Sequence, residues 1–173
     1  IEDELLQSEG KLRAMFKSIA DGVIVTDLQV LMTELNDATL FLHGYGRIEE
    51  LLGRTILDLV AEEDHPKGIE ALRKTFLQGH SGHMEYTLLA RDGKQTNAEL
   101  SAALMRDKSG KPTGFIMIVK DITERKRAEE EILQRNRELA ALHQVLTSIT
   151  QTLDLQQVLR EIVSQVGTAL VLL

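Results

Sequence analysis

The sequence predicts an α+β fold, in which a five-stranded antiparallel sheet carries helices against one of its faces. Two observations lead to this prediction. Along the chain, two β-prone stretches come first, several helical stretches follow, and three longer β-prone stretches come last. Turn signals such as Asp92-Gly93 separate the last strands and favour antiparallel hairpins.

An amphipathic helix and two strands come first in the chain. Residues 2–19 place their apolar side chains near one stripe and predict the helix. Residues 23–27 and 30–35 predict the two strands, and Leu28-Gln29 predict a tight connection between them.

Short helical segments fill the middle of the chain. Asn36 predicts the N-cap of the first of them. Residues 48–52 and 56–60 predict two further short turns. A longer helix is expected from about Pro66 to Gly79, because proline favours a first helical turn and glycine favours a helix end.

Three strands complete the predicted sheet, at residues 83–89, 95–105 and 114–120. In the last of them, apolar residues follow one another without alternation from Phe115 to Val119. Such a run is typical of a strand with both faces covered. We expect the amphipathic ends of the chain to cover the second face.

A heptad pattern follows the last strand from Ala128 onward. Arg135 interrupts the pattern, and the charges that flank it are nearly balanced. The pattern predicts a two-stranded coiled coil in a homodimer, and the alternative is a single helix packed on its own sheet. The predicted seam residues are Ile132, Leu139, Leu142, Leu146 and Ile149.

The composition fits a regulatory protein of the cytoplasm. The 173 residues are 43% apolar, which suffices for one medium-sized domain with an appended helix. A net charge of -7 argues against a nucleic-acid partner, which normally needs a basic face. The sequence shows no signal peptide and no apolar run long enough to cross a bilayer. The unfinished apolar run at the C-terminus leads us to expect a piece of a longer protein.

Catalytic and metal-binding patterns are missing from the sequence. The chain has no cysteine, which excludes a thiol nucleophile and a cysteine metal site. His143 lacks the acidic residue directly after it, and the arginine-threonine-proline run, of a phosphoacceptor histidine. His80 and His83 have no third ligand in view and are interpreted as residues of a solvated loop. We therefore expect this chain not to be an enzyme.

Seven short motifs occur in a fixed order: Gly22–Asp27, Asn36–Ala38, Gly44-Tyr45, Glu49–Gly53, Glu63-Asp64, Arg91–Gly93 and Asp121–Lys126. Together they resemble the PAS sensor family over residues 11–127. The resemblance implies the strand order 2-1-5-4-3 and a cavity between the sheet and the short helices. Residues 152–168 resemble, more weakly, the first helix of a GAF domain. The implied plan is an N-terminal helix (1–19), a PAS core (20–122), a coiled-coil linker (123–152) and the start of a GAF-like domain (153–173).

The resemblance also implies a function in signal transduction. The PAS core would act as a sensory and dimerisation module, and Asp121, Ile122 and Thr123 would pass a change in the core to the coiled coil. Thr123 or Asp121 is expected to cap the outgoing helix, and Asp121 is also a candidate to hold Arg125 or a backbone amide near the sheet edge. GAF and output domains would follow in the same chain, and the full-length protein would be a sensor histidine kinase or a cyclic-dinucleotide enzyme. A ligand-free dimerisation scaffold is the alternative.

The expected lining of the cavity is aliphatic. It favours a small apolar ligand such as a fatty acid, or no ligand, over a stacked planar one. Flavin photosensors of the light-oxygen-voltage type need a reactive cysteine, which is absent. A haem-based sensor that uses His65 as the axial ligand is the second alternative. The residues predicted to line the pocket are Ile24, Met32, Leu40, Phe41, Ile56, Leu72, Phe76, Leu88, Met117 and Val119.

Overall fold

The computed structural model describes the backbone of residues 2–170, and the side chains of these residues except 2–6, 9, 152–154 and 165–170. Ile1 and residues 171–173, which fall in the predicted N-terminal helix and the predicted GAF-like segment, lie outside the described residues. The chain divides into two units, Ile1–Lys126 and Arg127–Leu173.

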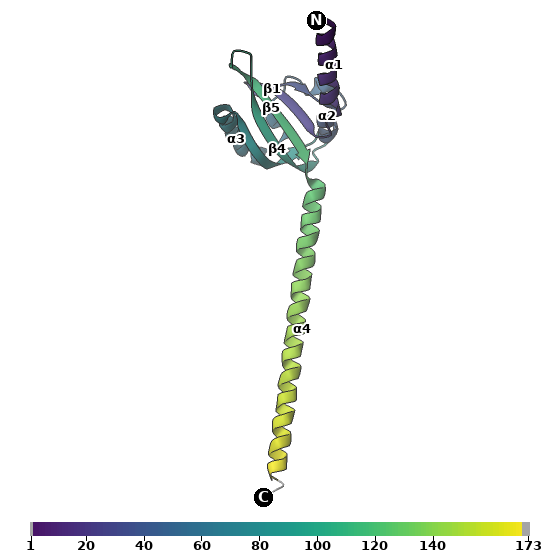
Figure 1. Ribbon diagram of the computed structural model, residues 1–173, viewed down its shortest axis with the longest axis vertical. Coiled ribbons are helices and arrows are strands. Elements are labelled where there is room, and N and C mark those ends of the chain that lie inside the picture. Colours follow the sequence, from purple (N-terminus) through teal and green to yellow (C-terminus); the bar gives the residue numbers. More distant parts are fainter. Residues whose placement is uncertain (1, 171–173) are drawn as a thin grey trace. The chain divides into compact units, whose positions relative to one another are not determined.

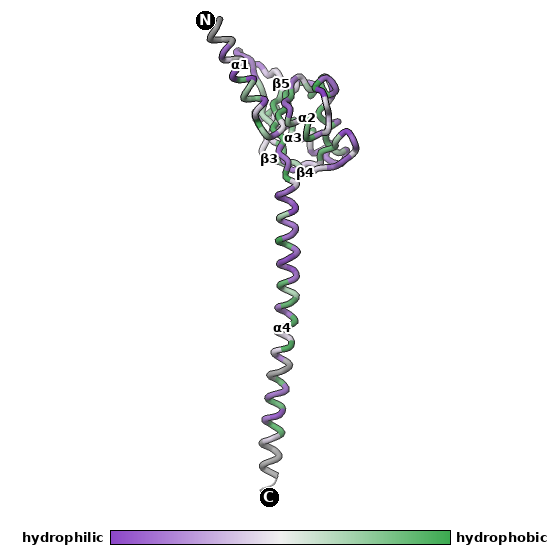
Figure 2. Tube along the Cα trace, turned by 90° about the vertical axis from the view of Figure 1, so that its right-hand side faces the viewer, coloured by the Kyte–Doolittle hydropathy of each residue, from purple (hydrophilic) through white to green (hydrophobic). Residues whose placement is uncertain are grey.

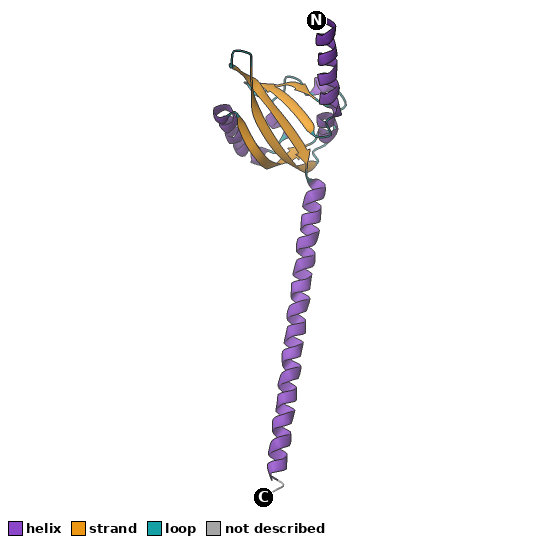
Figure 3. Cartoon of the chain, in the orientation of Figure 1, coloured by secondary structure: helices purple, strands orange, loops and turns teal. Residues whose placement is uncertain are grey.

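The first unit contains a five-stranded antiparallel sheet with the order β2-β1-β5-β4-β3 (Figure 3). This confirms the predicted α+β fold and the implied strand order. The strands are β1 (Gly22–Asp27), β2 (Met32–Leu35), β3 (His80–Leu89), β4 (Gln95–Arg106) and β5 (Pro112–Asp121). The helices are α1 (Glu2–Ser18), α2 (Asp37–His43), α3 (His65–Gln78) and α4 (Thr123–Leu170), with 3₁₀ turns η1 (Ile48–Glu50), η2 (Ile56–Leu59) and η3 (Glu62–Asp64).

Asn36 ties together the first elements of the fold and is almost fully buried. Its side-chain oxygen accepts hydrogen bonds from the backbone N–H groups of Val23 (2.9 Å) and Thr39 (3.1 Å). Its amide nitrogen donates to the carbonyls of Asp21 (2.9 Å) and Ile19 (3.3 Å). The predicted N-cap therefore also fixes the start of β1 and the end of the segment that follows α1.

The core lies between the inner face of the sheet and the short helices. α2, η2 and α3 pack on this face, with α3 against β3 and β4 (Figure 1). Inward-facing side chains of the strands alternate with outward-facing ones, as the pleat of a strand requires. The buried apolar cluster consists of Ile24, Met32, Leu35, Leu51, Ile56, Leu59, Val60, Tyr86, Leu88, Ala98, Phe115, Met117 and Val119.

The outer face of the sheet differs from the prediction. In β5, Phe115, Met117 and Val119 are buried, whereas Ile118 between them is 45% exposed. The unbroken apolar run therefore does not mean that both faces of this strand are covered within the described chain. The prediction was wrong because Ile118 belongs to the outer row of side chains, which the described residues leave largely uncovered at this position.

His80 and His83 also lie elsewhere than predicted. Both belong to β3, which begins at His80, and not to a loop. The pairing of β3 with β4 shifts register between Ser81 and Met84, as in a β-bulge. This irregularity hides the alternation from which the strand could have been recognised.

α4 is one helix of 48 residues (Figure 2). The plan implied by the resemblance begins a new segment at residue 153, but the helical backbone continues through Leu153 and Asp154. No glycine or proline interrupts the stretch before them. The shift in the apolar pattern is therefore a change of helix face and not a helix end. None of the helices that the structure describes is long and apolar enough to cross a membrane.

Candidate functional site

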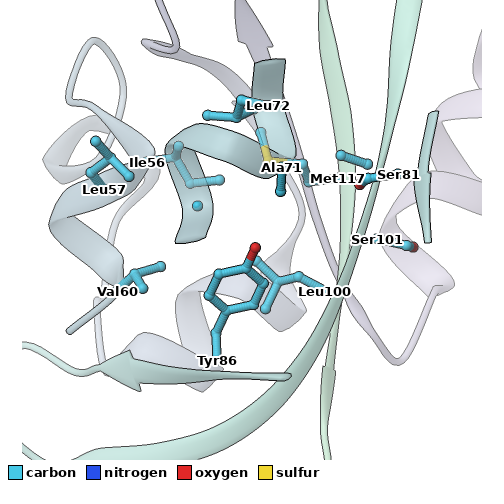
Figure 4. A pocket seen from close by; sticks show the side chains of 12 residues that line it. Ile56, Leu57, Val60, Ala71, Leu72, Ser81, Tyr86, Leu100, Ser101 and Met117 are labelled. Carbon is cyan, nitrogen blue, oxygen red and sulfur yellow. The ribbon is translucent and has the colours of Figure 1, made fainter. Parts of the chain in front are cut away.

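A cavity of about 40 Å³ lies between the sheet and the elements that cover its inner face (Figure 4). One wall comes from η2 and α3, and the other from β3, β4 and β5. Pockets for drug-sized ligands usually measure about 300–1,000 Å³, so this cavity accommodates only a very small molecule. Its lining consists of Ile56, Leu57, Val60, Gly68, Ala71, Leu72, Ser81, Tyr86, Leu100, Ser101, Ala102 and Met117.

Eight of the ten predicted pocket residues belong to the core, where they occupy three environments. Ile56, Leu72 and Met117 line the cavity. Leu40 is partly buried and packs against the core. Buried core positions away from the lining are occupied by Ile24, Met32, Leu88 and Val119.

Phe41 and Phe76 do not line the cavity. Phe41 is 90% exposed because α2 buries Thr39 and His43, which lie on the opposite side of this short helix. Phe76 is 46% exposed and lies on the flank of the α3 stripe that faces the cavity. The stripe consists of Gly68, Ala71, Leu72 and Thr75.

Tyr86 is one of several lining residues outside the predicted set, and it brings the largest side chain to the cavity (Figure 4). Burial, and to a smaller extent the negative charge of Asp64, raises the pKa of its phenol above the usual 10.0. The Lys67 ammonium lies 4.5 Å from the ring centroid, in a cation–π contact. The alternation of Met84, Tyr86 and Leu88 along β3 is the signal that could have identified this residue.

The polar groups of the lining are few. They are the hydroxyls of Tyr86 and Ser81, and the Tyr86 hydroxyl lies 3.9 Å from Met84 Sδ. Ser101 borders the cavity, but it pairs with Ile118 and its side chain belongs to the outer face of β4. A wall with so little polarity suits a small apolar ligand that makes no directional contacts.

His65 does not fit the role of a haem ligand in this structure. Its Nε2 lies 3.0 Å from the carbonyl oxygens of both Leu57 and Val60. The residue is half-buried and is not part of the cavity lining. The ring therefore fastens the start of α3 to η2.

Potential metal ligands do not cluster in the part of the chain that the structure describes, where no group of three or more His, Cys, Asp or Glu could hold an ion. His83 instead lies against a carboxylate, with Nδ1 3.4 Å from Glu99 Oε1.

The junction between β5 and α4 consists of Asp121, Ile122 and Thr123. The Asp121 carboxylate accepts a hydrogen bond from the Thr123 N–H at 2.8 Å, which satisfies one of the free donors of the first turn. Ile122 is only 2% exposed, and its N–H donates to the Asn97 carbonyl of β4 at 3.0 Å. The helix therefore starts from a buried residue that is bonded to the sheet.

Two cations of the first turn of α4 contact carboxylates on the sheet. Arg125 Nη2 lies 3.2 Å from Glu85 Oε1 and 3.3 Å from Glu99 Oε2. Lys126 Nζ lies 2.6 Å from Glu85 Oε2. The sequence offered Asp121 as a partner of Arg125. The structure gives Arg125 contacts with Glu85 on β3 and Glu99 on β4, which cross-strand pairing brings together.

The predicted seam residues of α4 are all more than half exposed in the single chain, namely Ile132, Leu139, Leu142, Leu146 and Ile149. Figure 2 shows apolar residues recurring among polar ones along this helix. Such a row on an isolated helix leaves apolar surface in water that a partner would bury.

Comparison with known proteins identifies the fold of the first unit. Residues 10–122 match the family model described as PAS fold. The chain is 25% identical over 144 residues to the sensor histidine kinase TmoS from Ectopseudomonas mendocina, covering 83% of this chain and 15% of that protein.

Solved structures of PAS and sensor histidine kinase domains are also similar to this chain. A PAS domain from Colwellia psychrerythraea has a TM-score of 0.61 at 25% identity, with 69% of this chain and 98% of that chain covered. A domain of a sensory box sensor histidine kinase/response regulator from Geobacter sulfurreducens has a TM-score of 0.56 at 26% identity, with 68% and 96% covered.

Proposed function

The chain belongs to the PAS family, and we propose that it is a non-catalytic sensory and dimerisation module of a signal-transduction protein. The observation that carries this proposal is the junction. β5 ends at Asp121 and α4 begins at Thr123, with the buried Ile122 between them. A displacement of the last strand would therefore reach the helix without a flexible linker to absorb it.

Dimerisation through α4 is the second part of the proposal. The exposed seam residues recur with heptad spacing, as a two-stranded coiled coil requires. Full burial of one such side chain stabilises by about 1.5–3 kcal/mol. Five of them in each helix offer enough apolar surface for a stable pair, and Arg135 weakens the pairing at one layer.

The ligand, if one binds, is proposed to be small and apolar. The cavity of about 40 Å³ holds no acyl chain, so a fatty acid, which the sequence suggested, does not fit this conformation. The lining offers the hydroxyls of Tyr86 and Ser81 and no charged side chain. The small volume also favours the second candidate, a ligand-free scaffold in which the core only dimerises.

The role in a larger protein is inferred from the relatives. The chain spans 15% of the length of the sensor histidine kinase that it matches. We propose that the full-length protein is a cytoplasmic sensor kinase or a related enzyme, with the predicted GAF-like and output domains after α4. The segment 153–173 remains the proposed start of the GAF-like domain.

Native mass spectrometry of the gently purified chain tests both parts of the proposal. We expect the mass of a dimer, and a discrete additional mass below that of a fatty acid if a ligand is retained. A dimer without added mass would support the scaffold. A monomer at concentrations well above the micromolar range would overturn the dimerisation module.

A further inference from the structure

Glu85 of β3 and Glu99 of β4 face each other directly across the two strands. Like charges in directly opposed positions of an antiparallel pair repel each other. Two carboxylates at such a pair therefore need cations nearby. A hydrogen bond from Lys126 holds the pKa of the Glu85 carboxyl below its ordinary value, with further help from the charges of Arg125 and Lys67.

The cations come from the first turn of α4. Arg125 bridges both glutamates through its guanidinium, at 3.2 Å from Glu85 and 3.3 Å from Glu99. Lys126 adds a 2.6 Å contact to Glu85. These four residues form an ion-pair cluster that lies wholly within the Ile1–Lys126 unit. Exposed ion pairs contribute little each, so such a cluster can open and close without unfolding the domain.

The same two strands carry the cavity wall. Side chains alternate between the faces of a strand, so Tyr86 and Leu100 point inward next to Glu85 and Glu99. On the α3 side, Lys67 donates a hydrogen bond to the carbonyl of Glu85 and lies over the ring of Tyr86. A shift of Tyr86 that widens or narrows the cavity would therefore move Glu85 as well.

We propose that Glu85 and Glu99 are positioning residues for α4, which hold its first turn on the sheet through Arg125 and Lys126. A change at the cavity reaches the helix through these two strands as well as through the β5 junction. This role rests on the proposed function of α4 as the output helix. It gives the helix two attachments, one at Ile122 and one at the ion-pair cluster.

Hydrogen exchange of the backbone amides of residues 126–130, in the complete 173-residue chain, tests the positioning role. Arg125→Glu places a negative charge at a helix N-terminus, where the helix dipole alone would strengthen the first turn. The ion-pair cluster predicts the opposite, namely about three- to tenfold faster exchange. Arg127→Glu is the matched control, since Arg127 is exposed and contacts neither glutamate in the described structure.

A charge swap between Glu99 and Arg125 distinguishes a positioning role of the ion pairs from a general loss of stability of the domain. Glu99→Arg alone should also speed the exchange, and Glu99→Arg combined with Arg125→Glu should restore most of the protection. Unchanged protection in Arg125→Glu, or a double variant no better than the single ones, would overturn the proposal. Amides of β1 and β5 report whether each variant is folded.

The dimer mass of every variant is measured in parallel. Monomers that retain the Arg125 effect would overturn the dimerisation module and leave the positioning role standing. Dimers in which Arg125→Glu does not speed the exchange would overturn the positioning role and leave the dimerisation module standing.

Discussion

Arg125 Nη2 lies 3.3 Å from Glu99 Oε2 and thereby joins the first turn of α4 to the middle of β4. The same guanidinium reaches Glu85 on the neighbouring strand. Together with the buried Ile122, these contacts attach the helix to three strands of the sheet. On the proposed positioning role, a change in how β3, β4 and β5 lie relative to one another would disturb these attachments of the first turn.

Asn36→Ala is expected to destabilise the domain by about 2–3 kcal/mol, because it removes a helix cap and leaves buried backbone donors without an acceptor. The acceptor now serves Val23 and Thr39. Urea denaturation of the core measures the change in the free energy of unfolding. Asn136→Ala, at an exposed position of α4, is the control and should change little. Equal effects of the two substitutions would contradict the role of Asn36.

Gly68→Ala is expected to stabilise the domain by about 0.5–1 kcal/mol, because alanine is the better helix former and no strained backbone is required. A Cβ at Gly68 would lie 3.6 Å from Leu57 and 3.8 Å from Tyr86, at ordinary contact distances. Gly79→Ala is the matched control. Its φ of +88° suits glycine, so the same change should destabilise. Thermal unfolding of both variants checks the opposite signs.

The stability of the domain should fall in mild acid because of His43. Burial lowers the pKa of His43 from its ordinary 6.5, although its hydrogen bond to the Leu89 carbonyl opposes the effect. The unfolded chain therefore binds a proton that the folded chain does not, and the free energy of unfolding decreases as the pH falls from about 7.5 to about 5.5.

The test of this pH dependence is His43→Gln, which should flatten the decrease over the same pH interval. His143→Gln, at an exposed position of α4, should leave the slope as it is. If His43→Gln and the unmodified chain lost stability in parallel, the titration of His43 would not be the cause.

Leu139→Glu combined with Leu142→Glu should convert the dimer to monomers, because both residues lie in the predicted seam. Light scattering at micromolar concentration measures the mass. Leu133→Glu makes the same chemical change on the same helix outside the seam, where the side chain is also exposed. It should leave the dimer intact. A dimer that survives the double change would place the interface outside α4.

Whether a feature of the fold or of the site could be predicted from the sequence depended on how far apart along the chain its interacting residues lie. Asn36 and Gly79 were identified because caps and helix ends act within a few residues. Phe41 was misplaced because α2 has only 7 residues, too few to define an apolar face without knowledge of what packs on it. The pairing of Glu85 with Glu99 depends on a register that shifts at Ser81, and no local pattern encodes that shift.

If the cavity and the first turn of α4 are coupled, filling the cavity should change the protection of that turn. Xenon, which enters dry apolar cavities, is a suitable probe for a lining of this kind. We would measure hydrogen exchange of residues 126–130 with and without xenon pressure, and follow binding by the ¹²⁹Xe resonance. Bound xenon is expected to change this exchange in the unmodified chain and much less in Glu99→Arg. Xenon bound in the cavity with no change in α4 would contradict the coupling.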